Sequence, residues 1–134
     1  MTAKLQSIFK RLYRAFGQQY WWPADTAFEV IVGAILTQGT SWSNVEKAIA
    51  NLKKKKLLSA AKLNALPARK LAGLIKSAGY YNIKANRLKC FLKFFFTLYR
   101  ADIQRMKKID TLLLRGQLLA VKGIGPETAD SILL

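Results

Sequence analysis

The amino-acid sequence predicts an all-α protein, and three observations support this fold class. Apolar residues recur every three or four positions along most of the chain, and helix-capping residues precede these periodic runs. No stretch alternates with a period of two for long enough to form a strand. The chain has 134 residues, of which 51% are apolar, and this is enough for one small domain with a hydrophobic core.

The first predicted helix covers residues 4–16, where one face is apolar and lysine and arginine occupy much of the rest. Gly17 is expected to end it. A helix of this kind normally packs on a core, and a basic helix lying on a membrane surface is the alternative. A linker over residues 18–25 follows, and Asp25 at its end is expected to cap the next helix.

Two capping boxes predict the next two helices. Thr26–Glu29 opens a helix that extends to about Thr37 and is apolar on nearly all sides, so it should be the buried central helix. Ser43–Glu46 opens a second helix that extends to about Leu52. The four lysines at positions 53–56 are expected to form a solvated helix end, and phosphate contact is a less specific alternative.

Four more helices and a basic connector are expected between residues 59 and 121. In chain order they are a short helix over 59–65, a helix from Pro67 to Gly79, a long helix over 83–99, the connector over 100–110, and a helix over 111–121. Asn82 and Asp110 are expected to cap the third and the fourth of these helices.

The last stretch, residues 118–134, predicts two helices joined by a tight hairpin. Gly123 and Gly125 permit backbone angles that a side chain would forbid, and Pro126 suits the first turn of a helix. Such a hairpin presents backbone N–H groups at a helix N-terminus beside Lys122, which makes a site for one phosphate. A glycine-rich corner between two helices, without a ligand, is the alternative.

The charge of the chain favours a polyanionic partner. Lysine and arginine number 23 against 7 aspartates and glutamates, which gives a net charge of +16. A compact molecule with this charge repels itself and attracts polyanions. Nucleic acid is therefore the leading candidate partner, and an anionic membrane surface is the lesser one.

The composition excludes several kinds of site. The chain has no histidine and Cys90 is its single cysteine, so it has no imidazole metal site, no internal disulfide and no four-cysteine cluster. Neither a metal nor another cofactor is expected. The first residues lack the apolar segment of a signal peptide, and no apolar run approaches the length of a membrane span. We therefore expect a cytoplasmic protein that does not enter a membrane.

Two segments resemble the endonuclease III-like DNA glycosylase superfamily. Lys122–Ala129 fits every position of its helix-hairpin-helix motif, and Gly79–Ala85 fits its pattern of glycine, an apolar or aromatic residue, and Tyr-Asn-x-Lys-Ala. The resemblance covers nearly the whole chain. It implies a helix-hairpin-helix DNA glycosylase fold, in which residues 23–134 form a six-helix barrel and residues 1–22 supply the N-terminal helix and linker of an incomplete second lobe. Double-stranded DNA with a damaged base would lie between the lobes, bound by a monomer.

The resemblance also implies individual DNA contacts. Gln38 would enter the DNA stack where the target base has been flipped out, although Gly39 departs from the polar residue that usually follows. Tyr80 would act as a wedge on the opposite strand. A simple loop residue and a packing residue are the respective alternatives. The other DNA contacts that the two motifs imply are Lys84, Lys122, Gly123, Ile124, Gly125 and Thr128.

Three tryptophans are candidates for a base pocket. The electron-rich faces of Trp21, Trp22 and Trp42 would stack on a positively charged alkylated purine, and core packing is the alternative. With these residues the chain most resembles the branch of the superfamily that removes 3-methyladenine in a single hydrolytic step.

The catalytic residues are only partly within the chain, according to the resemblance. Glu127 stands where some members carry a lysine that attacks the sugar and cuts the strand, so an amine nucleophile is not expected there. The catalytic aspartate is expected beyond Leu134, which would make the chain a truncated form that binds DNA without releasing a base. A non-catalytic helix-hairpin-helix DNA-binding module is the alternative. The iron–sulfur cluster of one subgroup could occur only in a longer parent protein.

Overall fold

The computed structural model describes residues 25–133, and all regular elements of this part are helical. They are α2 (Ala27–Leu36), α3 (Trp42–Lys54), α4 (Ala60–Ala65), α5 (Ala68–Leu74), the 3-10 turn η1 (Lys76–Ala78), α6 (Tyr81–Tyr99), α7 (Ile103–Lys107), α8 (Thr111–Leu119) and α9 (Pro126–Leu133). The all-α prediction is therefore confirmed. The helix expected over 4–16 and the candidate pocket residues Trp21 and Trp22 lie outside the described residues.

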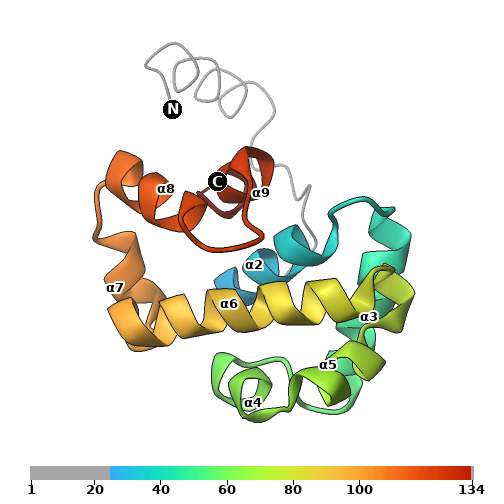
Figure 1. Cartoon of the computed structure of the whole chain (residues 1–134). Coiled ribbons are helices and arrows are strands. Elements are labelled where there is room, and N and C mark those ends of the chain that lie inside the picture. Colours follow the sequence, from blue (N-terminus) through green and yellow to red (C-terminus); the bar gives the residue numbers. More distant parts are fainter. Residues whose placement is uncertain (1–24, 134) are drawn as a thin grey trace.

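The longest of the described helices is α6, which has 19 residues and runs along the width of the molecule in Figure 1. The pair α8 and α9 lies on one side of α6, and α4 and α5 lie on the other. α2 packs against α3, α6 and α9. Two segments far apart in the sequence, the end of α2 and the hairpin before α9, are thereby brought side by side. No helix in the described part is both long and apolar enough to cross a membrane.

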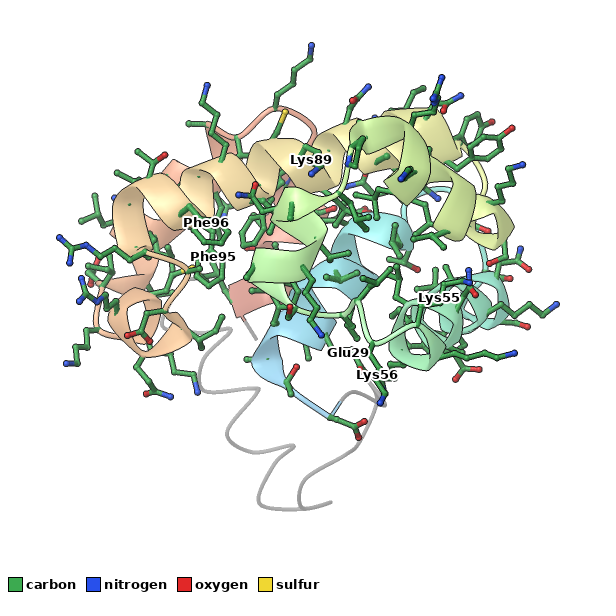
Figure 2. The ribbon with its side chains drawn as sticks, turned by 90° about the horizontal axis from the view of Figure 1, so that it is seen from below. Glu29, Lys55, Lys56, Lys89, Phe95 and Phe96 are labelled. Atoms are coloured by element: carbon green, nitrogen blue, oxygen red, sulfur yellow. The ribbon has the colours of Figure 1, made fainter. Side chains whose placement is uncertain are left out.

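The core follows the apolar faces that the periodicity predicts. Ile35 of α2 has no exposed surface, and Phe91 and Phe95 of α6 are 1% exposed. The rings of Phe91 and Phe95 stack with their centroids 5.4 Å apart. Phe95 points from α6 into the interior (Figure 2) and also stacks on Phe28 of α2 at 6.4 Å. The prediction that α2 is the buried central helix is confirmed.

The start of α2 carries a buried carboxylate. The hydroxyl of Thr26 accepts a hydrogen bond from the backbone N–H of Glu29 at 3.1 Å, as the capping box predicts. Glu29 is 2% exposed, and its carboxylate accepts from the N–H of Asp25 at 3.3 Å. Lys53 lies 2.6 Å from this carboxylate and 2.8 Å from that of Asp25, and these two hydrogen-bonded carboxylates raise the pKa of Lys53. Asp25 is therefore an ion-pair partner, and the prediction that it caps the helix is wrong.

Two other predicted caps are also wrong. α3 begins two residues early, because Ser41, and not Ser43, accepts from the backbone N–H of Asn44 at 3.4 Å. At the start of α6 the capping position falls on Tyr80, whose side chain makes no capping hydrogen bond. Asn82 lies already within the first turn, too late to cap it.

The connector over 100–110 contains a helix that the sequence analysis missed. Asp102 caps it by accepting from the N–H of Gln104 at 2.9 Å, and Met106 is its one fully buried side chain. A helix of five residues with a single buried position gives almost no periodic signal. Asp110 caps α8 as predicted, accepting from the N–H of Leu113 at 3.2 Å.

α4 is attached to α6 through a lysine. Lys89 of α6, directed toward α4 in Figure 2, donates to the backbone carbonyls of Leu63 and Asn64, each at 2.8 Å. Carbonyls near the end of a short helix lack partners within the helix, and a lysine amine satisfies them. Partial burial lowers the pKa of Lys89.

The ion pair between Lys53 and Glu29 gives a first prediction. Lys53→Met leaves the Glu29 carboxylate buried without its cation, and we expect the free energy of unfolding to fall by about 1–3 kcal/mol. Lys54→Met removes the same charge from the next residue, which is exposed, and should change it by less than about 0.5 kcal/mol. Urea unfolding of the two variants measures the difference. Equal effects would show that Glu29 does not depend on Lys53.

Candidate nucleic-acid interface

The hairpin between α8 and α9 has one glycine whose conformation requires it. Gly123 has a φ of +91°, whereas Gly125 does not have a positive φ. Between them Ile124 is 4% exposed, and its N–H donates to the carbonyl of Val121 at 3.1 Å. The N–H of Ala129 donates to the carbonyl of Gly125 at 2.9 Å. The sequence prediction is thus right for Gly123 and wrong for Gly125. The buried Ile124 anchors the hairpin, so its side chain is not a DNA contact.

Gln38 connects the turn after α2 to this hairpin. Its amide nitrogen donates to the carbonyl of Gly123 at 3.1 Å and to the hydroxyl of Thr128 at 2.8 Å. Its amide oxygen accepts from the guanidinium of Arg87 on α6. Because arginine only donates and a carbonyl only accepts, these partners fix which way the amide is turned. Gln38 is therefore held on the protein in this structure and is not a simple loop residue.

Arg87 is a residue of the candidate site that the sequence analysis did not identify. Its aliphatic stem lies against Gly123, where an added Cβ would clash with Cγ and Cδ of Arg87. It also lines an open hollow of about 680 Å³, together with Gln38 and the hairpin residues Gly123–Thr128. Arg87 therefore brings a positive charge to the place where the hairpin and the turn after α2 meet. Its position three residues after Lys84 gave no signal of this contact.

The charged residues in and after the hairpin differ in exposure and in ion pairing. Lys122, just before Gly123, is exposed, and Glu127 is exposed and lines the hollow. Asp130 is bound to Arg115, with 2.9 Å between the carboxylate and the guanidinium. The hydrogen bond to Asp130 and the negative charge of that carboxylate raise the pKa of Arg115. Asp130 is a surface residue of α9.

Tyr80 projects from a strained turn just before α6. It is 71% exposed and has a φ of 44°, and it follows Gly79, which has a φ of 71°. A non-glycine residue rarely adopts a positive φ. The exposure of Tyr80 excludes the alternative that it is a packing residue. Its neighbour Tyr81 is 37% exposed, and its ring lies 5.8 Å from the amine of Lys76.

Lys84 is not where the sequence analysis expected it. It is 1% exposed, and its amine donates to the backbone carbonyl of Ala78 at 2.6 Å. Burial, and secondarily the nearby charge of Arg87, lower its pKa. The prediction that Lys84 lies exposed for contact with DNA is wrong. The signal was present, since Lys84 lies four residues before Leu88 and so belongs to the apolar stripe of α6.

Trp42 does not join the hollow. Its ring packs on α2, where a Cβ added to Gly33 would lie 3.3 Å from it, and its Nε1 donates to Glu46 at 2.8 Å. Trp42 is the one predicted base-pocket residue within the described part of the chain, and it is not among the residues that line the hollow.

No metal site is visible among residues 25–133. No three side chains of histidine, cysteine, aspartate or glutamate gather there in a way that could hold an ion, and Cys90 is a half-buried free thiol.

Comparison with known proteins agrees with this arrangement. Residues 32–113 match the model of the HhH-GPD superfamily of base excision DNA repair proteins. A Methanocaldococcus jannaschii protein described as a candidate DNA repair glycosylase is 52% identical over 132 residues, which are 97% of this chain and 60% of the relative. The chain thus spans about three fifths of that protein's length.

Two solved structures are similar in fold. The 3-methyladenine DNA glycosylase MagIII of H. pylori, bound to 1,N6-ethenoadenine, is 29% identical with a TM-score of 0.75, over 97% of this chain and 62% of that one. Endonuclease III in a non-covalent DNA complex is 20% identical with a TM-score of 0.70, over 99% of this chain and 59% of that one. The second likeness concerns the fold alone.

The two hairpin glycines allow a matched test. Gly123→Ala places a Cβ on Arg87 and forces alanine to a φ of +91°, so the free energy of unfolding should fall by at least about 1–2 kcal/mol. At Gly125 an added Cβ meets nothing within 4 Å and the φ is not positive, so Gly125→Ala should be close to neutral. Chemical unfolding of both variants tests this, and a reversed order would contradict the hairpin geometry.

The lowered pKa of Lys84 gives a prediction for alkaline pH. As the pH rises toward the unfolded pKa of 10.5, the folded state releases the Lys84 proton first, so the unfolded state binds more protons. The contribution of Lys84 to the free energy of unfolding therefore increases with pH in this range. Lys84→Met removes that contribution. The pKa of Lys89 is also lowered, but Lys89 is present in both the wild type and the variant and so contributes equally to both slopes. Unfolding curves at several alkaline pH values should show a less positive slope for the variant, and parallel slopes would contradict the burial of a charged amine.

Proposed function

Since the chain belongs to the HhH-GPD superfamily of base excision DNA repair proteins, we propose that it binds double-stranded DNA with a damaged base as part of a DNA glycosylase. The observation that carries this proposal is the binding of Gln38 to Gly123 and Thr128, 85 and 90 residues further along the chain. It joins a candidate gap-filling residue and a candidate phosphate site in one face.

The hairpin supplies the phosphate site in this proposal. Pro126 starts α9 without an N–H, and Ala129 is the first residue whose N–H bonds back, to Gly125. The amides of residues 127 and 128 therefore lie at the positive end of the helix dipole. Lys122 is exposed beside them. These groups together favour a phosphate of the DNA backbone, which positions the duplex without reading its sequence.

Gln38 and Tyr80 act on the bases in this proposal. Tyr80 already projects from the surface and can wedge between bases of the opposite strand. Gln38 can pair with the base left alone after flipping, because its amide both donates and accepts. To do so it must leave Gly123, Thr128 and Arg87. DNA phosphate near Arg87 would compete for the guanidinium and so assist this release.

For the reaction, we propose hydrolysis of the N-glycosidic bond without strand cleavage. Glu127 offers a carboxylate and not an amine where a lyase would need its nucleophile. An alkylated or etheno-modified purine is the proposed substrate class, supported by the H. pylori relative, which is bound to 1,N6-ethenoadenine. Residues 1–22 would belong to a second lobe, as the resemblance implies.

A second candidate is DNA binding without base removal. It is favoured because α9 offers no amine at Glu127 and because the carboxylate of Asp130 is already paired with Arg115. Release of a modified base by the 134-residue chain from a duplex with 1,N6-ethenoadenine would exclude it.

The salt dependence of binding tests the proposed interface. Fluorescence anisotropy measures the affinity of the chain for a labelled duplex over a series of salt concentrations. Lys122→Gln should weaken binding and reduce the slope of log K against log salt by about 1, because one phosphate contact is lost. Lys108→Gln, a matched change at an exposed lysine after α7, should leave the slope nearly unchanged. Equal slopes in both variants would overturn the assignment of the hairpin as the phosphate site.

A further inference from the structure

Tyr80 keeps a backbone conformation that its own residue type disfavours. Gly79 and Tyr80 both have positive φ values, 71° and 44°, and the Tyr80 side chain is 71% exposed. An exposed side chain gains little from burial that could offset this strain. A conformation of this kind is unfavourable for a tyrosine and persists only when the surroundings enforce it. The contacts of the turn therefore have to hold it in place.

The turn is fastened on both sides. Before it, the hydroxyl of Ser77 donates to the carbonyl of Asn44 on α3 at 3.1 Å. The N–H of Gly79 donates to the carbonyl of Lys76 at 3.1 Å. After the turn, Lys84 donates two hydrogen bonds to it. Its backbone N–H donates to the carbonyl of Tyr80 at 2.9 Å, and its side-chain amine reaches back to the carbonyl of Ala78 at 2.6 Å.

The amine of Lys84 is costly to bury. Transfer of a charged amine from water into the interior is unfavourable unless it is well paired. None of the ion pairs among the described residues includes Lys84. Its hydrogen-bond partner in the described structure is the carbonyl of Ala78, the residue immediately before Gly79. The one interaction that compensates the buried amine is thus also a clamp on the strained turn.

We propose that Lys84 is a positioning residue that clamps the Gly79–Tyr80 turn and so holds the Tyr80 side chain outward for the DNA duplex. The clamp itself follows from the contacts of the turn. Its consequence for DNA rests on the proposed function. The two parts are tested by separate measurements, so that one can fail without the other.

The first measurement concerns the clamp alone. In Lys84→Met, which keeps the length of the stem and removes the amine, the backbone amide of Gly79 should exchange its hydrogen about tenfold faster or more. Lys93→Met removes the same charge from an exposed site on the same helix and should leave this amide unchanged. Unchanged exchange in Lys84→Met would overturn the proposal. If that variant does not fold, Lys84→Gln, whose shorter side chain cannot span the same distance, takes its place with the same expected result.

The second measurement is a double-mutant cycle on DNA binding. Anisotropy gives the affinity for a duplex with an abasic site, which has a gap beside the wedge, and for the intact duplex. Lys84→Met and Tyr80→Ala should each reduce the preference for the abasic duplex by about fivefold to tenfold, relative to Lys93→Met. In the Tyr80→Ala background, Lys84→Met should cause no further loss of preference.

The outcomes of the cycle are distinct. A loss caused by Lys84→Met that persists in the Tyr80→Ala background would show that Lys84 acts on DNA by another route, and would overturn the proposal. If Tyr80→Ala does not change the preference for the abasic duplex, the proposed wedge function fails, and hydrogen exchange at Gly79 still decides whether Lys84 is the clamp.

Discussion

The three hydrogen bonds of the Gln38 amide hold together the face on which the rest of the account depends. They bind the turn after α2 to the hairpin before α9, and they bring in Arg87 from α6. Two of the partners, Gly123 and Thr128, belong to the hairpin and the first turn of α9, and the third, Arg87, belongs to α6. The absence of a side chain at Gly123 is required as well, because the stem of Arg87 occupies that space. The elements that we propose to contact DNA are thus positioned by polar contacts placed on an apolar core.

Two charged side chains, Glu29 and Lys84, are buried although their removal from water costs free energy. Glu29 is compensated by Lys53 and by the backbone N–H of Asp25, and so it fixes α2 against α3. The amine of Lys84 is bound to the backbone carbonyl of Ala78 and to no carboxylate of the described residues, and so it fixes the turn that follows Ala78. In both cases the cost of removing a charge from water is offset by a specific geometry. One charge stabilises the core, and the other stabilises a conformation next to an exposed tyrosine.

Local signals predicted most of the fold. The apolar period of 3.6 residues predicted α2, α3 and α6. The order Gly-x-Gly-Pro predicted the hairpin and the start of α9. The errors at Ser43 and Asn82 are shifts of a cap by two residues, which a pattern read one segment at a time cannot resolve. α7 was missed because a single buried methionine makes no period.

The site was harder to predict than the fold, for a physical reason. Its key contacts join residues 49 to 90 positions apart, and side-chain spacing along one helix carries no information about them. The family resemblance identified Gln38 and Tyr80, but not that Gln38 is bound to the hairpin or that Arg87 contacts both. Lys84 was assigned to DNA from the family motif, while its place on the apolar stripe of α6 indicated burial. A charged residue on a core stripe should be considered a structural clamp before it is considered a ligand contact.

The central claim is that the hairpin, Gln38 and the Tyr80 turn form one face for duplex DNA. Titration of the isotope-labelled chain with a short duplex, followed by NMR, tests this most directly, because the side-chain amide of Gln38 gives its own signal. The account predicts that this signal, the backbone amides of residues 122–128 and the amide of Tyr80 shift together at the same DNA concentrations. Shifts confined to the lysines at 53–56 and to α4, with the Gln38 amide unchanged, would contradict it.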